Sequence, residues 1–168
     1  MSTGKFEIRH ETVGDAPVLS RLAAEAFGPG RFTRSAYRVR EGVAPVAGLS
    51  LCGVLDGQLV GGIRFTAIRI GDKEGGVLLG PLIVDPAATA RGFGKALVEE
   101  GLARARAERF SVVLLVGDMP YYGRFGFTPV MPGRITLPGP VDPARLLGLE
   151  LVTGEMECAA GPVKGYAR

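Results

Sequence analysis

Near the middle of the chain an apolar run leads into a glycine-containing turn and then into a helical pattern, and this order limits what the chain can fold into. The run VLLGPLIVD occupies 77–85, and glycines stand at positions 92 and 94. A chain that leaves a strand and enters a helix here has several unpaired backbone N–H groups. The glycines remove side chains that would keep a diphosphate away, and Arg91 and Lys95 add charge to that of the helix N-terminus. The turn predicts a phosphate site, and a turn of the same kind without a ligand stays open as the alternative.

Two other nucleotide-binding patterns do not fit this turn. A Walker loop needs Gly-Lys-Ser/Thr, and here Gly94-Lys95 is followed by Ala96. A dinucleotide fingerprint needs a third glycine three residues after the second, and that position holds Leu97. We therefore expect that the ligand is neither ATP nor NAD.

The periodicity of the whole chain predicts an α+β fold. Strands are expected at 5–10, 49–56, 58–70, 77–85 and 111–117, with a hairpin turn at Asp56-Gly57 and a further strand at Phe127. Helices are expected from a cap at Asp15 to Phe27, at 31–41, at 94–110 and, capped by Asp118, at 119–124. The tail beyond Arg134 predicts one helical turn and one or two edge strands. This order indicates a single mixed, mostly antiparallel sheet with one crossover, flanked by helices.

The helical spacing also predicts which side chains face the core. In the first helix these are Val18, Leu19, Leu22, Ala23, Ala26 and Phe27. In the helix at 94–110 they are Ala96, Leu97, Leu102, Ala103 and Ala107.

Length and composition narrow the class of protein. The 168 residues suffice for one packed core, so we expect a single domain over 1–168. A net charge of +3 without a dense basic run argues against nucleic-acid binding. Neither a bilayer-spanning run nor a hydrophobic N-terminal leader is present, which predicts a cytoplasmic protein without a membrane partner. Cys52 and Cys158 fit no metal spacing, so we expect buried free thiols and no metal.

Two motifs in order resemble the GNAT superfamily of N-acetyltransferases. Thr89-Ala90-Arg91-Gly92-Phe93-Gly94-Lys95-Ala96 overlays the family's Gln/Arg-x-x-Gly-x-Gly/Ala turn, with LGPLIVDP upstream in the place of its fourth strand. Thr89 replaces the usual Gln or Arg, and its hydroxyl is still able to bind a phosphate oxygen. In GDMPYYGRFGF, Tyr122 stands four residues before Gly126-Phe127, as in the family's second motif. The second motif looks most like a branch of predicted, largely uncharacterised bacterial acetyltransferases.

The resemblance implies a GNAT-like acyl-CoA N-acyltransferase fold and acetyl-CoA as the acetyl donor, with no metal. An amine would attack the thioester directly in a ternary complex, and Tyr122 would be the general acid for the leaving thiolate. The implied cofactor-binding residues are Leu82, Ile83, Val84, Thr89, Ala90, Arg91, Gly92, Phe93, Gly94, Lys95, Ala96, Tyr121 and Phe125. The implied partner is a small-molecule or peptide amine, and whether the chain forms a homodimer stays open.

Several points stay open at the level of sequence. His10, Asp118 and Glu25 are the candidates for a general base, and none of them is favoured over a chain of water molecules. Tyr122 has the alternative role of a core aromatic beside Phe125. The acceptor, which residues 28–48 and the tail are expected to shape, has no signature. A CoA-binding module without catalysis, a longer acyl donor and a non-amine acceptor are the alternative functions.

Overall fold

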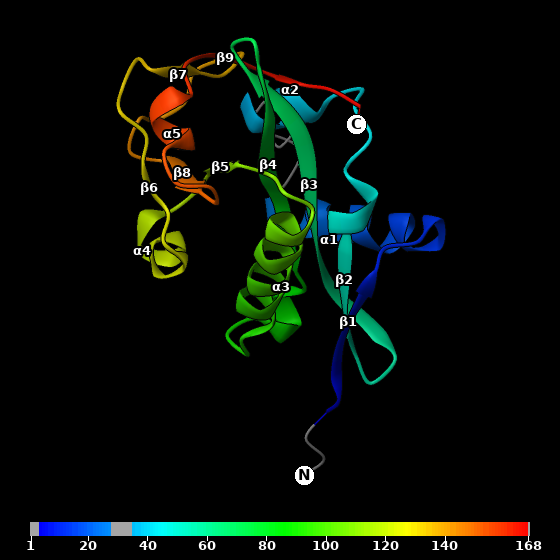
Figure 1. The fold of residues 1–168 in the computed structure, drawn as a ribbon. Helices are drawn as coiled ribbons and strands as arrows, with labels where there is room; N and C mark the ends of the chain where they lie inside the picture. The colour runs from blue at the N-terminus through cyan, green and yellow to red at the C-terminus, as the bar shows by residue number, and fades with distance from the viewer. Residues whose placement is uncertain (1–3, 28–34, 168) are drawn as a thin grey trace.

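The computed structural model describes residues 4–27 and 35–167, whose strands form a mixed sheet (Figure 1). Along its main path the strands lie in the order β1 (Phe6–His10), β2 (Leu51–Leu55), β3 (Gln58–Ile70), β4 (Lys73–Val84), β5 (Val112–Val116), β8 (Leu146–Glu150) and β6 (Thr128–Pro129). Neighbours on this path are antiparallel except β4 and β5, which are parallel. β9 (Gly161–Gly165) pairs with the end of β3, and β7 (Ile135–Thr136) pairs with β9. The prediction of a mixed, mostly antiparallel sheet is confirmed.

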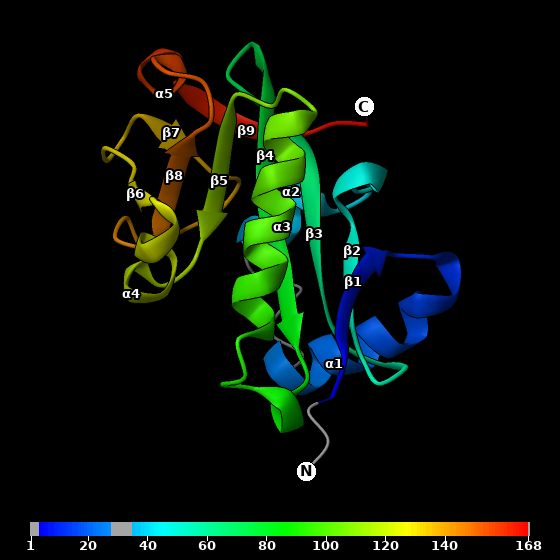
Figure 2. The same cartoon turned by 60° about the horizontal axis from the view of Figure 1, so that its bottom comes forward.

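Helices cover both faces of this sheet. The helices are α1 (Ala16–Phe27), α2 (Ser35–Arg40), α3 (Phe93–Ala107), α4 (Met119–Tyr122) and α5 (Glu155–Cys158). The short 3-10 turns are Val13–Asp15, Ala47–Leu49, Pro86–Ala88 and Gly123–Phe125. Side chains alternate along β3, so Phe65 joins the core under α3 while Ile68 joins the core that contains Val39 of α2. Figure 2 shows α3 in front of β3 and β4, with α2 behind them.

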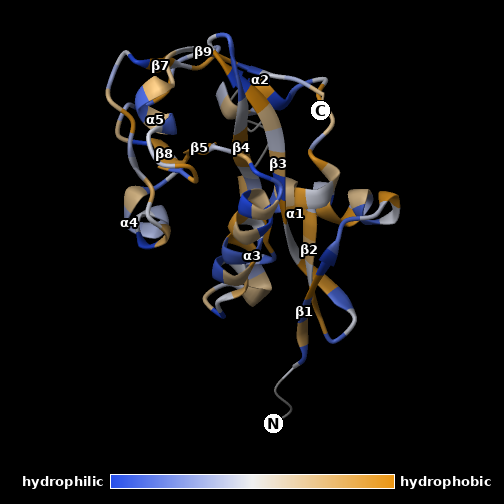
Figure 3. Ribbon diagram, in the orientation of Figure 1, coloured by the Kyte–Doolittle hydropathy of each residue, from blue (hydrophilic) through white to orange (hydrophobic). Residues whose placement is uncertain are grey.

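The buried side of α3 is rotated relative to the prediction. The helix buries Phe93, Leu97, Val98, Gly101, Leu102 and Ala105. Ala103 and Ala107, which we expected to face the core, are exposed, as is Ala26 of α1. A Cβ on Gly101 would lie 2.6 Å from the Phe65 ring, so the ring packs directly against the helix backbone at this glycine. Alanine occurs both in cores and on surfaces, so the spacing of alanines did not define the buried face of α3. Figure 3 shows hydrophilic and hydrophobic residues alternating along this helix.

The turns and the tail differ from the prediction in several details. The turn at Asp56-Gly57 has φ values of 50° and 81°, as a two-residue type I′ hairpin requires. β4 begins at Lys73 rather than at 77, because Ile70 pairs with Lys73 and only two residues form the turn between them. β8 is not an edge strand: it lies between β5 and β6, and its first three residues are buried. β6 begins one residue after Phe127.

The boundaries of two other predicted segments also moved. The expected helix at 31–41 is present as α2 from Ser35, and its first four positions lie outside the described residues. Leu49, expected in a strand, belongs to the 3-10 turn that precedes β2. No helix in the described ranges is long and apolar enough to cross a membrane.

Asp15 is a buried ion-pair partner, and it caps the 3-10 turn before α1 from the third position of a capping box whose first residue is Thr12. Its carboxylate accepts hydrogen bonds from the guanidinium of Arg9 at 2.7 and 2.8 Å and from the backbone N–H of Thr12 at 2.7 Å. The hydrogen bond from Arg9 contributes most, and together these bonds hold the pKa of Asp15 well below its ordinary value. Cys52 lies 3.6 Å away, and burial raises the pKa of its thiol to about 12, so that thiol is protonated at neutral pH. Cys158, in contrast, is exposed, so only one of the two thiols is buried as expected.

Candidate functional site

The parallel strands β4 and β5 pair over a short stretch and then part. Gly76–Leu78 pairs with Val112–Leu114, and β4 continues beyond this ladder to Val84. Figure 2 shows the two strands diverging, with the start of α3 on one side and α4 on the other. On its opposite edge this stretch of β4 stays paired with β3 as far as Val84. We call the place where β4 (from Leu79 to Val84) separates from β5 the parting. Because N–H groups alternate between the two edges of a strand, about half of the N–H groups of residues 79–84 face the parting. No described strand pairs with these N–H groups.

A bulge in β4 lies where this divergence begins. Ile63 faces Leu82 and Phe65 faces Leu79, so Gly80 and Pro81 together stand opposite the single residue between them on β3. An extra residue bends a strand and increases its local twist. Gly80 has a φ of 133°, which favours glycine. The bulge therefore accounts for the change in direction of β4 away from β5.

The segment that follows β4 presents backbone N–H groups at the start of a helix. Gly92 precedes α3 with a φ of 82°, and Ala90 has a φ of 64°. The N–H of Ala96 bonds the carbonyl of Gly92 at 3.0 Å and so begins the helical ladder. The N–H groups of residues 93–95 precede this bond and point out of the helix N-terminus. A bound anion would satisfy them and would gain from the helix dipole.

The two glycines of this turn have different surroundings. A Cβ on Gly92 would meet nothing within 4 Å. A Cβ on Gly94 would lie 2.8 Å from the hydroxyl of Tyr121 and 3.4 Å from Cγ2 of Val84. Gly92 therefore leaves open space at the helix start, whereas Gly94 makes room for a tyrosine from the other side of the parting. The sequence argument gave both glycines one role, room for a diphosphate, which stays a prediction, and it did not foresee the contact of Gly94 with Tyr121.

Polar side chains near the turn are partly engaged within the protein. The hydroxyl of Thr89 donates to the carbonyl of Pro86 at 3.0 Å, so it already has a partner. The guanidinium of Arg91 lies 5.2 Å from the centre of the Phe93 ring. Lys95 has its ammonium 3.8 Å from Glu99, and half of its side-chain surface is exposed. The two cations are positioned to interact with an anion at the start of α3.

Aromatic rings from α4 and the following turn line the opposite side of the parting. The Tyr121 ring centre lies 4.8 Å from that of Tyr122 and 5.9 Å from that of Phe125, both in edge-on arrangements. The guanidinium of Arg124 lies 4.3 Å from the centre of the Tyr121 ring. These contacts hold the Tyr121 ring in place while its hydroxyl reaches toward Gly94.

Tyr122 packs into the core and keeps its proton. Its ring is edge-on to Phe127 at 6.0 Å, and a Cβ on Gly117 would lie 2.5 Å from its Cε2 atom. Burial, with smaller contributions from Tyr121 and Asp118, raises the pKa of Tyr122 to about 12, while Arg145 acts in the opposite direction. No hydrogen bond within the described part of the chain occupies its hydroxyl. The phenol is therefore protonated at neutral pH and free to donate.

The candidate bases are dispersed. Nε2 of His10, on β1, accepts from Arg104 at 2.9 Å, near the C-terminal part of α3 and away from the parting. Glu25 is exposed on α1. The carboxylate of Asp118 lies 3.5 Å from Nε of Arg145, and its backbone carbonyl, rather than its side chain, accepts the N–H groups at the start of α4. Asp118 is the N-cap residue of α4 as predicted, but its side chain makes no capping hydrogen bond.

The structure thus brings the strand residues, the α3 turn and the Tyr121 ring together around one parting of the sheet. Sequence reasoning missed the bulge at Gly80-Pro81, although a proline inside a strand pattern is a signal for one. It also missed Arg40 of α2, whose Nη1 would lie 3.1 Å from a Cβ on Gly80, and Arg124 over the Tyr121 ring. Arg40 lies outside both motifs, and Arg124 lies within GDMPYYGRFGF at a position to which the sequence argument gave no role.

Comparison with known proteins connects this geometry to a family. The model of the acetyltransferase (GNAT) family matches residues 17–127, which include the bulge, the α3 turn and both tyrosines. The uncharacterized N-acetyltransferase YhbS of Escherichia coli K12 is 30% identical over 121 residues, which cover 71% of this chain and 72% of that protein. The chain belongs to the GNAT acetyltransferase family.

Solved GNAT structures share the fold described above. YhbS of Escherichia coli in complex with CoA has a TM-score of 0.83 at 24% identity and covers 99% of this chain and 92% of its own. A GNAT family acetyltransferase of Brucella melitensis in complex with acetyl-CoA has a TM-score of 0.63 at 30% identity and covers 86% of this chain and 96% of its own. Membership of the GNAT family supports an acyltransferase activity, and these similar proteins bind CoA or acetyl-CoA.

The contact between Gly94 and Tyr121 generates a test of the site's geometry. Alanine in place of glycine stabilises a helix by about 0.5–1 kcal/mol, but here the new Cβ meets the Tyr121 hydroxyl. We expect Gly94→Ala to increase the free energy of unfolding in a Tyr121→Phe background and to give a smaller gain, or a loss, with Tyr121 present. Urea unfolding of the four variants measures the coupling. Equal effects in both backgrounds would show that the hydroxyl does not lie against Gly94.

Proposed function

We propose that this chain transfers an acetyl group from acetyl-CoA to an amine by direct attack within a ternary complex. The observation that carries the proposal is the parting of β4 from β5 next to the N-terminus of α3. One elongated ligand suits both features, because a diphosphate fits the helix start and a narrow arm fits between the strands. We further propose that residues 1–168 act as a single domain.

The start of α3 is the proposed site of the CoA diphosphate. Its free N–H groups at 93–95, the open space at Gly92 and the charges of Arg91 and Lys95 all favour an anion there. Among the proposed contacts we include the backbone of Ala90 and Ala96 and the ring of Phe93. Thr89 supports the turn through its bond to Pro86 rather than through the ligand.

The pantetheine arm and the thioester are proposed to lie along the free edge of β4. Because the N–H of Asp85 donates to Val60 on β3, alternation directs the N–H of Ile83 to β3 and those of Leu82 and Val84 to the parting. The latter would donate to the thioester carbonyl and stabilise the negative charge that develops on its oxygen, with Ile83 between them as part of the same strand edge. Tyr121 and Phe125 would form the opposite wall. The Tyr121 hydroxyl, which touches the position of a Gly94 Cβ, would have to contact the arm or move aside.

Tyr122 is the proposed general acid. In the reaction the neutral amine attacks the thioester carbon, the C–S bond breaks, and the thiolate takes the proton of the phenol. A tyrosine with a pKa of about 12 holds that proton throughout the neutral range, donates a hydrogen bond to the thiolate as the C–S bond breaks, and regains from solvent any proton that it transfers. The proton that the amine loses goes to solvent or to a base that we do not assign. The acceptor class that we propose is a small-molecule or peptide amine.

Substitution of Gly92 tests the position of the diphosphate. Gly92→Asp places a carboxylate at the start of α3, so we expect the CoA affinity measured by calorimetry to fall at least about 10-fold through charge repulsion. Gly57→Asp is the matched control, because Gly57 has a φ of 81° against 82° at Gly92 and both positions have open space. Both variants place an aspartate at nearly the same positive φ, and only Gly92→Asp should weaken binding. Unchanged CoA affinity in Gly92→Asp would place the diphosphate elsewhere.

Removal of the Tyr122 hydroxyl tests the general acid. Tyr122→Phe keeps the buried ring, so the melting temperature and CoA affinity should change little while kcat falls about 10²–10⁴-fold. Because the phenol has a pKa of about 12, the ratio of wild-type to variant rate should stay constant from about pH 7 to pH 10. Rates are measured by thiol release with an amine that a screen identifies. A variant within about threefold of wild type would show that Tyr122 serves packing alone.

A further inference from the structure

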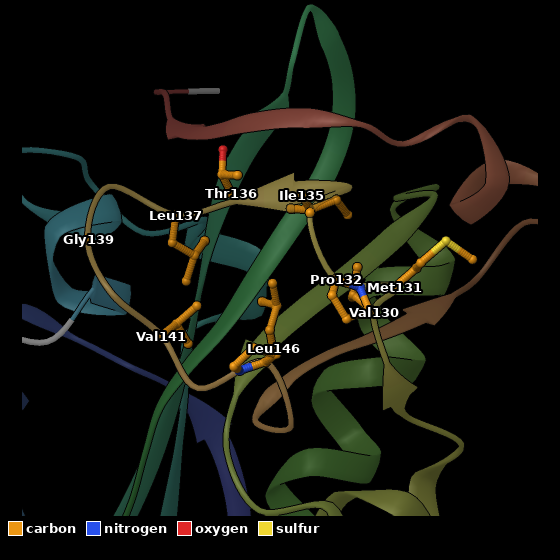
Figure 4. A pocket seen from close by; sticks show the side chains of 11 residues that line it. Val130, Met131, Pro132, Ile135, Thr136, Leu137, Gly139, Val141 and Leu146 are labelled. Atoms are coloured by element: carbon orange, nitrogen blue, oxygen red, sulfur yellow. The ribbon is translucent and has the colours of Figure 1, made fainter.

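The segment between β6 and β8 encloses a pocket on the sheet face opposite α3. Its volume is about 260 Å³, and residues from Val130 to Leu146 line it (Figure 4). None of the lining residues carries a charged side chain, and the only side-chain polar group among them is the hydroxyl of Thr136. Figure 4 shows Leu137, Val141 and Leu146 directed toward the hollow. A space of this kind accommodates an aliphatic or aromatic group.

The register of the strands places this pocket beside the parting of β4 and β5. Pairing of the two strands ends at Leu78 and Leu114, and two residues further on stand Gly80 of the bulge and Val116. Val116 pairs with Leu146 on the next strand, which lies about 4.8 Å away. The pocket floor is therefore one strand from the parting, at the level of the bulge.

The side-chain directions place the pocket on the face where an acceptor would meet the thioester. Leu78, Leu114 and Leu146 belong to the same core cluster, opposite α3, and Val116 packs against it. A ligand whose diphosphate lies at the start of α3 and whose arm passes between the strands directs its acyl end toward this second face. An acceptor that approaches from there has the pocket next to its reacting nitrogen.

α2 braces the wall of the pocket and contributes positive charge. The hydroxyl of Ser35 donates to the carbonyl of Pro140 at 2.6 Å, and Nη1 of Arg38 donates to the carbonyl of Pro138 at 3.1 Å. Arg40, on the same helix, approaches the bulge at Gly80. The guanidinium of Arg38 beside the uncharged pocket opposes an acceptor with several ammonium groups.

We propose that the pocket of residues 130–146 binds an aryl or branched alkyl group of the acceptor, so that the substrate is an apolar monoamine rather than a polyamine or a lysine-rich peptide. The inference rests on the proposed function, because it assumes that the thioester lies at the parting. The inference assigns the acceptor to a chemical class, the apolar monoamines, that neither the fold nor the family specifies.

Two primary amines test the proposal: 2-phenylethylamine, which carries an aryl group, and ethanolamine, which carries a hydroxyl group. With saturating acetyl-CoA, kcat/KM for 2-phenylethylamine should exceed that for ethanolamine by about 10- to 100-fold. This is the ratio expected from the free energy gained when an aryl group is buried in an apolar pocket. Leu137→Phe and Val141→Phe each fill the pocket and should remove most of this preference while CoA affinity stays unchanged. Val152→Phe, at an exposed position outside the pocket, is the matched control and should preserve the preference.

A binding measurement separates failure of this inference from failure of the proposed function. Amide chemical-shift mapping of 2-phenylethylamine on the CoA-loaded protein should locate the amine at 135–141, whether or not it is turned over. Shifts confined to another surface, equal rates for the two amines, or an unchanged preference in both pocket variants would overturn the inference. Absence of CoA binding in calorimetry would instead contradict the proposed function. In that case, shift mapping of 2-phenylethylamine on the protein without CoA would still show whether the amine binds in the pocket.

Discussion

Beyond Leu78, β4 hydrogen-bonds to β3 on one edge and has no described strand on the other. An unpaired strand edge inside a sheet leaves backbone donors and acceptors without partners, and their desolvation is costly unless water or a ligand satisfies them. The bulge at Gly80 and Pro81 creates this edge, and the turn into α3 adds a second set of free N–H groups directly after it. The site is therefore built mainly from main-chain groups, and its side chains serve to keep space open and to supply charge.

The same geometry gives the sheet two faces with different surroundings. The helix start, Arg91 and Lys95 lie on the side of α3, where an anion is favoured, whereas α2 and the pocket at 130–146 lie on the opposite side. The CoA that we propose to pass between β4 and β5 would connect them. Tyr121 and Tyr122 stand at this passage with distinct surroundings: the hydroxyl of the first reaches Gly94, and the ring of the second is packed against Gly117.

Sequence patterns predicted those features that short-range spacing determines. The hairpin at Asp56-Gly57, the strand–turn–helix unit and the order of the two family motifs were all correct, and GNAT membership is confirmed. Features that depend on long-range pairing were missed, such as the interior position of β8, which only its pairing with β5 and β6 reveals. The rotation of α3 was misjudged because the Phe65 ring packs on Gly101, a contact between distant positions that alanine spacing does not reveal. The contact between Gly94 and the Tyr121 hydroxyl was missed for the same reason.

The central claim is that the parting of β4 and β5, together with the start of α3, forms the CoA site, and a crystal structure of this chain with CoA tests it most directly. The account predicts the diphosphate within hydrogen-bond distance of the N–H groups at 93–95 and the pantetheine arm between β4 and β5. It also predicts that the thiol lies near Tyr122, on the way to the face that carries α2. A CoA molecule bound elsewhere, or one whose diphosphate avoids the start of α3, would contradict the account.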